Sequence, residues 1–151
     1  MAEPQTSVSL TPVLDGQICF ALYNASRAIT AQYRGLLAPL GLTYPQYLVM
    51  LVLWQTGPLT VTQLGDQLQL DSGTLSPLLR RLQTASLIDR ARRVDDERSV
   101  QVSLTAAGAA LHTRAAHIPE RICASTGLGL NEIDTLRRQI NELAEHVRAS
   151  A

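Results

Sequence analysis

The segment 59–104 constrains the fold most, because two short helical patterns are followed there by a predicted pair of strands, one of which shows a clear alternation. Leu64 and Leu68 lie one turn apart and predict a short helix around 62–68. A turn of three or four residues follows, and Asp71 or Ser72 is a suitable N-cap for a second helix. The apolar face of that helix is formed by Leu75, Leu78, Leu79 and Leu82. This arrangement is typical of a helix-turn-helix.

A strand pattern follows the second helix. Val100, Val102 and Leu104 alternate with polar residues, and Leu87 and Ile88 begin a partner strand. The charged segment of about 92–98 would form the tip of the hairpin. A hairpin directly after a helix-turn-helix is a wing, so we expect a mainly α fold with a small β-hairpin and a winged helix-turn-helix lobe at about 45–105.

Short polar groups begin the second helix, "SGTLSPLLRR", at the end that enters the major groove in such motifs. Arg98 follows Asp96 and Glu97, so a carboxylate could orient its guanidinium toward the narrow minor groove of A·T-rich DNA. Pro77 lies inside the helix and predicts local distortion. The alternatives are an ordinary surface helix and a solvated salt bridge in the turn. The residues expected to contact DNA are Ser72, Gly73, Thr74, Ser76, Pro77, Arg80, Arg81, Arg92, Asp96 and Arg98.

Arginine supplies every basic side chain of this chain, whose formal net charge is zero. Six of the thirteen arginines fall within 80–98, together with four acids, which leaves this segment at about +2. The first 16 residues lack the basic and apolar regions of a signal peptide, and the segment up to about residue 12 is expected to be disordered. The apolar run "YLVMLVLW" is too short for a membrane span. We therefore expect a cytoplasmic protein with free thiols.

Further amphipathic helices flank the winged segment in a chain that we expect to be a single domain over 1–151. One follows Asp15, another runs from about 106 to 124 with a kink at Pro119, and the last is expected to be capped by Asn131, with Asp134 three residues later. Their apolar stripes exceed what a lobe of roughly 60 residues can cover. They either pack on one another within one chain or, as we expect, form dimerisation helices at about 13–38 and 106–150.

Cys19 is a candidate reactive thiol because it lies about one turn into its predicted helix, where the dipole favours a thiolate. Tyr23 is its i+4 neighbour. Tyr33 lies on the same face, but about 21 Å away along the helix. It could reach only the Cys19 of an antiparallel partner helix. The alternative is a small buried hydrophobic residue.

The chain resembles the MarR family, and within it the two-cysteine type of the organic-hydroperoxide-sensing repressors called OhrR. The stretches that carry the resemblance are "QICFALY", "LTYPQY", "LDSGTLSPLLRRL" and "DERSVQVSLT", together with Tyr33. The spacings of four, fourteen and twenty-five from Cys19 to Tyr23, Tyr33 and Tyr44 are the specific part of it. The resemblance implies a homodimeric repressor of double-stranded operator DNA, which regulates a gene for an organic hydroperoxide reductase.

The resemblance also implies roles for individual residues. Cys19 would be the peroxidatic thiol, hydrogen-bonded by Tyr33 and Tyr44 of the other subunit, with Tyr23 as an accessory wall of the pocket. Oxidation to a sulfenic acid would let Cys123 of the opposite subunit form an intersubunit disulfide, which would release the DNA. Cys123 could instead be a buried structural thiol. An apolar pocket formed by Ile18, Phe20, Leu22 and the "YLVML" helix would favour organic peroxides as the inducer.

Three other interpretations stay open at this point. A MarR-type repressor could be released by a small phenolic ligand, with Cys19 incidental. An enzyme, a thiol peroxidase, is disfavoured because the chain lacks a Cys-x-x-Cys motif and the strand–helix alternation of a thioredoxin-like fold. A metal sensor is disfavoured because the histidines and cysteines lack ligand spacing. We expect no cofactor and no metal.

Overall fold

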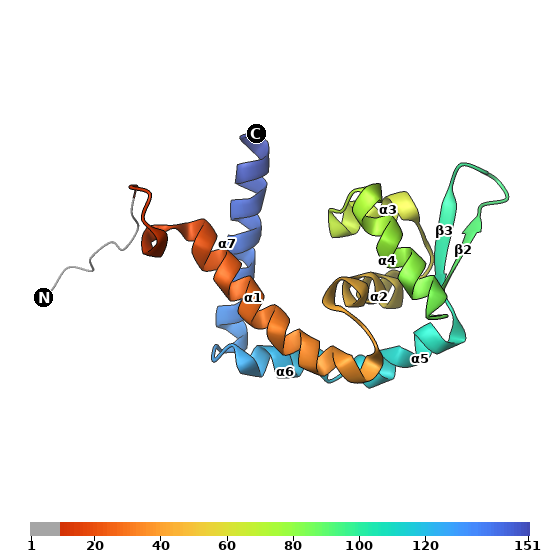
Figure 1. Cartoon of the computed structure of the whole chain (residues 1–151), viewed down its shortest axis with the longest axis horizontal. Helices are drawn as coiled ribbons and strands as arrows, with labels where there is room; N and C mark the ends of the chain where they lie inside the picture. The colour runs from red at the N-terminus through yellow and green to blue at the C-terminus, as the bar shows by residue number, and fades with distance from the viewer. Residues whose placement is uncertain (1–9) are drawn as a thin grey trace, which may run out of the picture. The chain divides into compact units, whose positions relative to one another are not determined.

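The computed structural model describes residues 10–151, and part of the segment expected to be disordered lies outside this range. The chain divides into two compact units (Figure 1). One contains Met1–Tyr33 and Ile122–Ala151, and the other contains Arg34–Arg121. The predicted fold class, mainly α with a small hairpin, is confirmed.

The unit 34–121 holds the winged helix-turn-helix. Its elements are the 3-10 helix Ala38–Leu40, α2 (Tyr44–Thr56), β1 (Leu59–Thr60), α3 (Val61–Leu68), α4 (Ser72–Thr84), β2 (Ile88–Arg92), β3 (Val100–Leu104) and α5 (Ala106–Ala115). The antiparallel sheet has the order β1-β3-β2, with Ile88 opposite Leu104 and Leu59 opposite Val102. The strand β1 was not predicted, because a two-residue strand is too short to show an alternating pattern.

The core of this unit forms around α2 and α4. Tyr47, Met50 and Leu53 of α2 are fully buried, as are Leu64 of α3 and Ile88 of β2. All four leucines of the predicted α4 face are buried. Because these leucines lie on one face of α4, most of the polar residues between them face the solvent.

Side-chain caps begin the helices of this unit. Thr43 and Thr60 each form a capping box, with Gln46 and Gln63 respectively. At α4, Asp71 is the N-cap, and its Oδ1 accepts a 2.7 Å hydrogen bond from the Thr74 N–H. Each helix start is thus defined by a hydroxyl or carboxylate that satisfies a free backbone donor.

The helix α5 packs within this unit, beyond the boundary at 105 that the sequence suggested for the lobe. The Trp54 indole donates to the Gly108 carbonyl at 2.9 Å, and its ring stacks on His112 with centroids 5.2 Å apart. The Arg114 guanidinium donates to the Pro39 carbonyl at 2.9 Å. These contacts attach α5 to α2 and to the 3-10 helix.

The other unit contains the 3-10 helix Leu14–Gly16, most of α1 (Ile18–Leu37), the second half of α6 (Ile118–Ser125) and α7 (Leu130–Ala149). The predicted helix from 106 to 124 is in fact two helices, α5 and α6, interrupted at Ala116 and His117. Pro119 falls in the first turn of α6, where its missing N–H is tolerated, so the chain breaks before the proline and not at it.

The start of α7 and the path of α4 at Pro77 were also predicted from the sequence. The predicted cap at Asn131 is wrong, because α7 begins at Leu130 with Gly129 before it, and the Gly129 N–H donates to Glu132 Oε2 at 2.7 Å. Asp134 instead forms ion pairs with Arg137 and Arg138 on the surface. Pro77 lies inside α4, which runs without interruption from Ser72 to Thr84.

Within residues 10–151, no single helix is both long and apolar enough to cross a membrane. The stretches Ile18–Leu40 and Tyr44–Thr56 meet those criteria only when taken together across a bend. The same part of the chain holds no cluster of three or more His, Cys, Asp or Glu side chains suited to a metal ion.

Gly108 is required by a close approach of α5 to the segment before β2. A Cβ added there would overlap the backbone carbonyl oxygen of Leu87. We expect Gly108→Ala to lower the free energy of unfolding by about 1–3 kcal/mol, although alanine is the better helix former. Urea unfolding at fixed protein concentration measures this change.

Gly35→Ala is the matched control, because a Cβ at this helical glycine meets no atom within 4 Å. It should leave the chain as stable as before or stabilise it by about 0.5–1 kcal/mol. Equal destabilisation by both substitutions would contradict the role given to Gly108.

Candidate functional site

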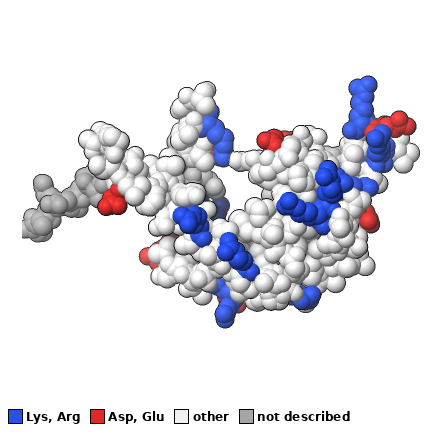
Figure 2. Space-filling model, viewed as in Figure 1, with Lys and Arg blue, Asp and Glu red and all other residues white. Residues whose placement is uncertain are grey.

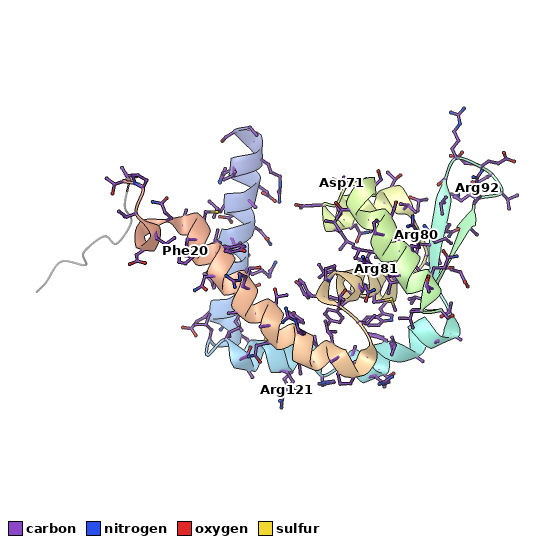
Figure 3. All side chains as sticks on the ribbon, in the orientation of Figure 1. Phe20, Asp71, Arg80, Arg81, Arg92 and Arg121 are labelled. Atoms are coloured by element: carbon purple, nitrogen blue, oxygen red, sulfur yellow. The ribbon has the colours of Figure 1, made fainter. Side chains whose placement is uncertain are left out.

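The exposed face of α4 carries most of the residues expected to contact DNA. Because the leucines of α4 are buried, Ser72, Gly73 and Thr74 at its start are exposed, and so are Pro77, Arg80 and Arg81; Ser76 is half-buried. Figure 2 shows basic side chains gathered over α4 and the hairpin, and Figure 3 labels Arg80 and Arg81 on α4 and Arg92 on the hairpin. The face offers short hydroxyls followed by two guanidinium groups, a set suited to bases and phosphates.

The hairpin between β2 and β3 has a different charge arrangement from the expected one. Arg93 and Asp95 form the ion pair, with the Arg93 Nε and Nη2 atoms 2.9 and 2.7 Å from the carboxylate. Asp96 instead accepts a 3.1 Å hydrogen bond from the backbone N–H of Arg98. Among the described residues, no carboxylate bonds the guanidinium of Arg98. Asp96 therefore shapes the turn and leaves the Arg98 side chain unpaired.

Cys19 is an exposed residue of this chain and lies in the first turn of α1. Tyr23 follows one turn later and is also exposed. The Arg27 guanidinium carbon lies 5.4 Å from the centroid of the Tyr23 ring, a cation–π contact. Cys19, Tyr23 and Arg27 thus follow one another at steps of four along one face. Arg27 was missed in the sequence, although its i+4 spacing from Tyr23 was visible.

Tyr33 lies too far along α1 to contact the Cys19 of its own chain. Tyr33 lies on α1, fourteen residues after Cys19, which in a continuous α-helix is about 21 Å. Tyr44 is the first residue of α2 in the other unit. Burial raises the pKa of Tyr44, so its phenol stays protonated, and a hydrogen-bond donor, well above neutral pH.

Cys123 lies near the end of α6 and is partly exposed. Its carbonyl accepts hydrogen bonds from the Thr126 hydroxyl at 2.7 Å and from the Thr126 N–H at 3.1 Å. Ser125 donates to the Ile122 carbonyl at 2.7 Å. These hydroxyls cap the end of α6 directly after the thiol, and Gly127, with φ 71°, continues the turn. Both cysteines are free in this structure.

The residues expected to host the tail of an organic peroxide are only partly available. Ile18 and Phe20 are exposed and Leu22 is half-buried. In the "YLVML" segment, Tyr47, Val49 and Met50 are at most 2% exposed and belong to the core. These three offer no surface to a ligand in this chain, so the prediction for the segment rests on its other members. Leu48 and Leu51 are its only members with exposed surface.

Asp71 makes the stability of the start of α4 dependent on pH. Hydrogen bonds from the Thr74 backbone hold the pKa of this carboxyl below its usual value. Its stabilising effect is therefore fully present above the ordinary aspartate pKa of about 3.9 and is lost as the pH falls through the lower folded pKa.

We expect Asp71→Ala to lower the midpoint of thermal unfolding by a few degrees at pH 7. Asp71→Asn should retain most of the stability at pH 7, because its amide oxygen still accepts the bond. Its stability relative to the wild type should rise as the pH falls below 3.9. A stability of Asp71→Ala equal to that of the wild type at pH 7 would refute the capping role.

Comparisons with known proteins agree with this geometry. The model of the MarR family matches residues 42–100. The organic hydroperoxide resistance transcriptional regulator of Bacillus subtilis is 46% identical over 132 residues, which cover 87% of this chain and 90% of that protein.

Among solved structures, the reduced, DNA-bound form of AbfR, a protein of Staphylococcus epidermidis, superposes with a TM-score of 0.76 at 33% identity, covering 89% of this chain and 93% of that one. The disulfide form of AbfR superposes with a TM-score of 0.61 at 34% identity, covering 90% of each chain.

Proposed function

Because the chain belongs to the MarR family of transcriptional regulators, we propose that it is a redox-sensing repressor that binds operator DNA as a reduced homodimer. An organic hydroperoxide would oxidise Cys19 and release the DNA. The observation that carries this proposal is the exposed thiol in the first turn of α1, followed by Tyr23 on the same face. The relatives it matches are regulators and not enzymes, and we assign this chain a regulatory, cytoplasmic role on the same basis.

The DNA-binding part of the proposal rests on α4 and the hairpin. The start of α4 is exposed, polar and held by Asp71, which suits a helix that enters the major groove. Arg80, Arg81 and Arg92 are exposed and supply phosphate or base contacts. AbfR, which this chain resembles over most of its length, is known in a DNA-bound form.

The homodimer is supported by the apolar surface of the unit that contains α1 and α7. None of the twenty residues of α7 is buried, and its stripe includes Leu136 and Ile140, which are 44% and 38% exposed. A groove of about 370 Å³ adds Ala25, Ile29 and Leu128 to this surface. Apolar surface of this extent marks an interface, and a second copy of the chain is its natural partner in a two-fold regulator.

The proposed chemistry begins with Cys19 as a thiolate, which is the form in which a cysteine acts as a nucleophile. The sulfur attacks the distal, hydroxyl oxygen of the hydroperoxide and the O–O bond breaks, which leaves the hydroxyl on sulfur as a sulfenic acid; the alkoxide takes a proton from water and leaves as an alcohol. The partner's Tyr33 and Tyr44 donate hydrogen bonds to the thiolate. Cys123 of the partner subunit then displaces the hydroxyl as water, and a disulfide forms between the two sulfur atoms.

The consequence for DNA binding follows from the position of Cys123. It lies near the end of α6, before Gly127 and Gly129, and its delivery to Cys19 would rearrange the segment that contains these glycines. A covalent link between subunits changes the spacing of the two recognition helices, which must match half-sites about one DNA turn apart. The relative AbfR is known in both a DNA-bound reduced form and a disulfide form.

One equivalent of an organic hydroperoxide should convert the reduced wild-type protein into a covalent dimer on a non-reducing gel. Neither Cys19→Ser nor Cys123→Ser should form this dimer, and a mixture of the two variants should form a dimer joined by one disulfide. DNA release should require Cys19 in every case. If both thiols stay reduced, the redox proposal is wrong, and release by phenolic ligands becomes the hypothesis to test.

Ile140→Asp should convert the dimer into a monomer, because it places a charge in the apolar stripe of α7. Affinity for DNA should fall at least tenfold, since one half-site contact is lost. Light scattering after size-exclusion chromatography measures the mass. Gln139→Asp is the control, because it introduces the same charge at the adjacent exposed position and should leave the dimer intact.

A further inference from the structure

The chain passes from one unit to the other twice, and both passages lie inside helices. The boundary falls between Tyr33 and Arg34 in α1 and between Arg121 and Ile122 in α6. Backbone hydrogen bonds hold every turn of a helix, so a shift at one end is carried to the other. The segments by which α1 and α6 enter the unit 34–121 are therefore the covalent routes by which a change in one unit reaches the other.

Both of these segments are anchored in the core of the unit 34–121. Leu37, the last residue of α1, is buried, and so is Leu40 of the 3-10 helix that follows. At the other passage, Ile118 at the start of α6 and Ala115 at the end of α5 are buried. Because protein interiors are closely packed, neither segment can shift without moving the side chains around it.

A hydrogen bond between residues 75 positions apart joins the two segments. The Arg114 Nη2 donates to the Pro39 carbonyl at 2.9 Å. Arg114 lies in the last turn of α5, from which only Ala116 and His117 separate α6. Pro39 lies in the 3-10 helix between α1 and α2. The bond thus connects the end of α5, and with it the start of α6, to the segment that leads from α1 into α2.

The Pro39 carbonyl depends on Arg114 because the backbone around it offers no donor. The N–H groups of Gly41, Leu42 and Thr43 all donate to other acceptors. Carbonyl groups at the end of a helix need a donor from elsewhere, and a charged donor forms the stronger hydrogen bond. Within residues 10–151 the Arg114 guanidinium forms no ion pair, so this carbonyl, and no carboxylate, sets its direction.

The groups of the proposed redox chemistry lie close to this bond along the chain. Cys123 is on α6, five residues after Ile118, and Tyr44 follows Pro39 by five residues and begins α2. The helix α2 in turn packs on α4. Cys123 and Tyr44 are therefore each attached to one of the two segments that the bond joins.

We propose that Arg114 is a positioning residue that couples the redox site to the DNA-binding lobe. Its bond to Pro39 holds the start of α6 to the segment before α2, so a shift of α6 on disulfide formation is passed to α2 and then to α4. The inference rests on the proposed redox function and deepens it. Loss of the bond should leave the chemistry of Cys19 and Cys123 intact and weaken its effect on DNA.

The test compares the affinity of the reduced protein and of its peroxide-induced covalent dimer for one duplex, selected by the reduced wild type from a random-sequence pool. Arg114→Met removes the donors and keeps a side chain of similar length. It should form the covalent dimer as the wild type does, but oxidation should weaken its DNA binding about three- to tenfold less, the range for one hydrogen bond at a solvated site. Arg114→Lys should restore most of the response, since its ammonium group can donate to the same carbonyl.

A second measurement on the reduced protein needs neither peroxide nor DNA. The Gly41 and Leu42 amides donate within the 3-10 segment, to the Ala38 and Leu37 carbonyls. If the bond holds this segment, Arg114→Met should raise the hydrogen-exchange rates of both amides at least threefold, as measured by NMR.

The matched control is Arg121→Met, which removes the same charge from an exposed position on α6. Figure 3 shows the Arg121 side chain pointing away from the ribbon. Its exchange rates and its response to oxidation should equal those of the wild type. Thermal melting of each variant confirms that it is folded.

Three results would overturn the inference. A response to oxidation in Arg114→Met equal to that of the wild type would exclude the coupling role. Equal weakening of DNA binding in both redox states would mean that the bond only stabilises the fold. Unchanged exchange at Gly41 and Leu42 would mean that it does not hold the segment before α2.

Failure of the proposed function gives a different result. A wild type that forms no covalent dimer, or that keeps its DNA affinity after oxidation, refutes the redox function and with it the coupling role. The exchange rates still decide, in that case, whether the bond joins the two segments.

Discussion

The burial of one face of α4 is the constraint on which the DNA-binding lobe depends. Leu75, Leu79 and Leu82 are almost fully buried, so α4 can rotate about its axis only by exposing them to water. At about 1.5–3 kcal/mol for each fully buried leucine, such a rotation would cost most of the stability of a domain this size. The polar face and its arginines are therefore held in a fixed direction by residues that never touch DNA.

The distribution of positive charge on the surface depends on which arginines form ion pairs with carboxylates. Arg93 is neutralised by Asp95, and Arg137 and Arg138 share Asp134. The arginines around α4 and the base of the hairpin have no such partner among the described residues. A chain with no net charge thus presents an unbalanced positive surface where the proposed function requires one, which composition alone would not reveal.

The periodic parts of the fold were predictable, and the pairings between distant residues were not. The leucine stripe, the hairpin and the start of α4 at Asp71 follow from local patterns that a sequence displays directly. The two-residue strand β1 and the contact of Trp54 with Gly108 depend on residues more than forty positions apart. A carboxylate bonded to the Arg98 guanidinium was predicted from sequence proximity. In the structure Asp96 instead accepts a hydrogen bond from the backbone N–H of Arg98. At the proposed thiol site, spacing predicts that Tyr23 lies one turn after Cys19, whereas the contacts proposed for Tyr33 and Tyr44 depend on a second subunit and stay a prediction.

The contacts of Trp54 also determine what spectroscopy can see in this molecule. It is the only tryptophan in the chain, and it is held between α2 and α5 by its bond to Gly108 and its stack on His112. Its emission is consequently a reporter of that one junction. Oxidation that alters the tryptophan emission has transmitted its effect into the DNA-binding unit, whereas an event limited to α1 would leave this emission unchanged.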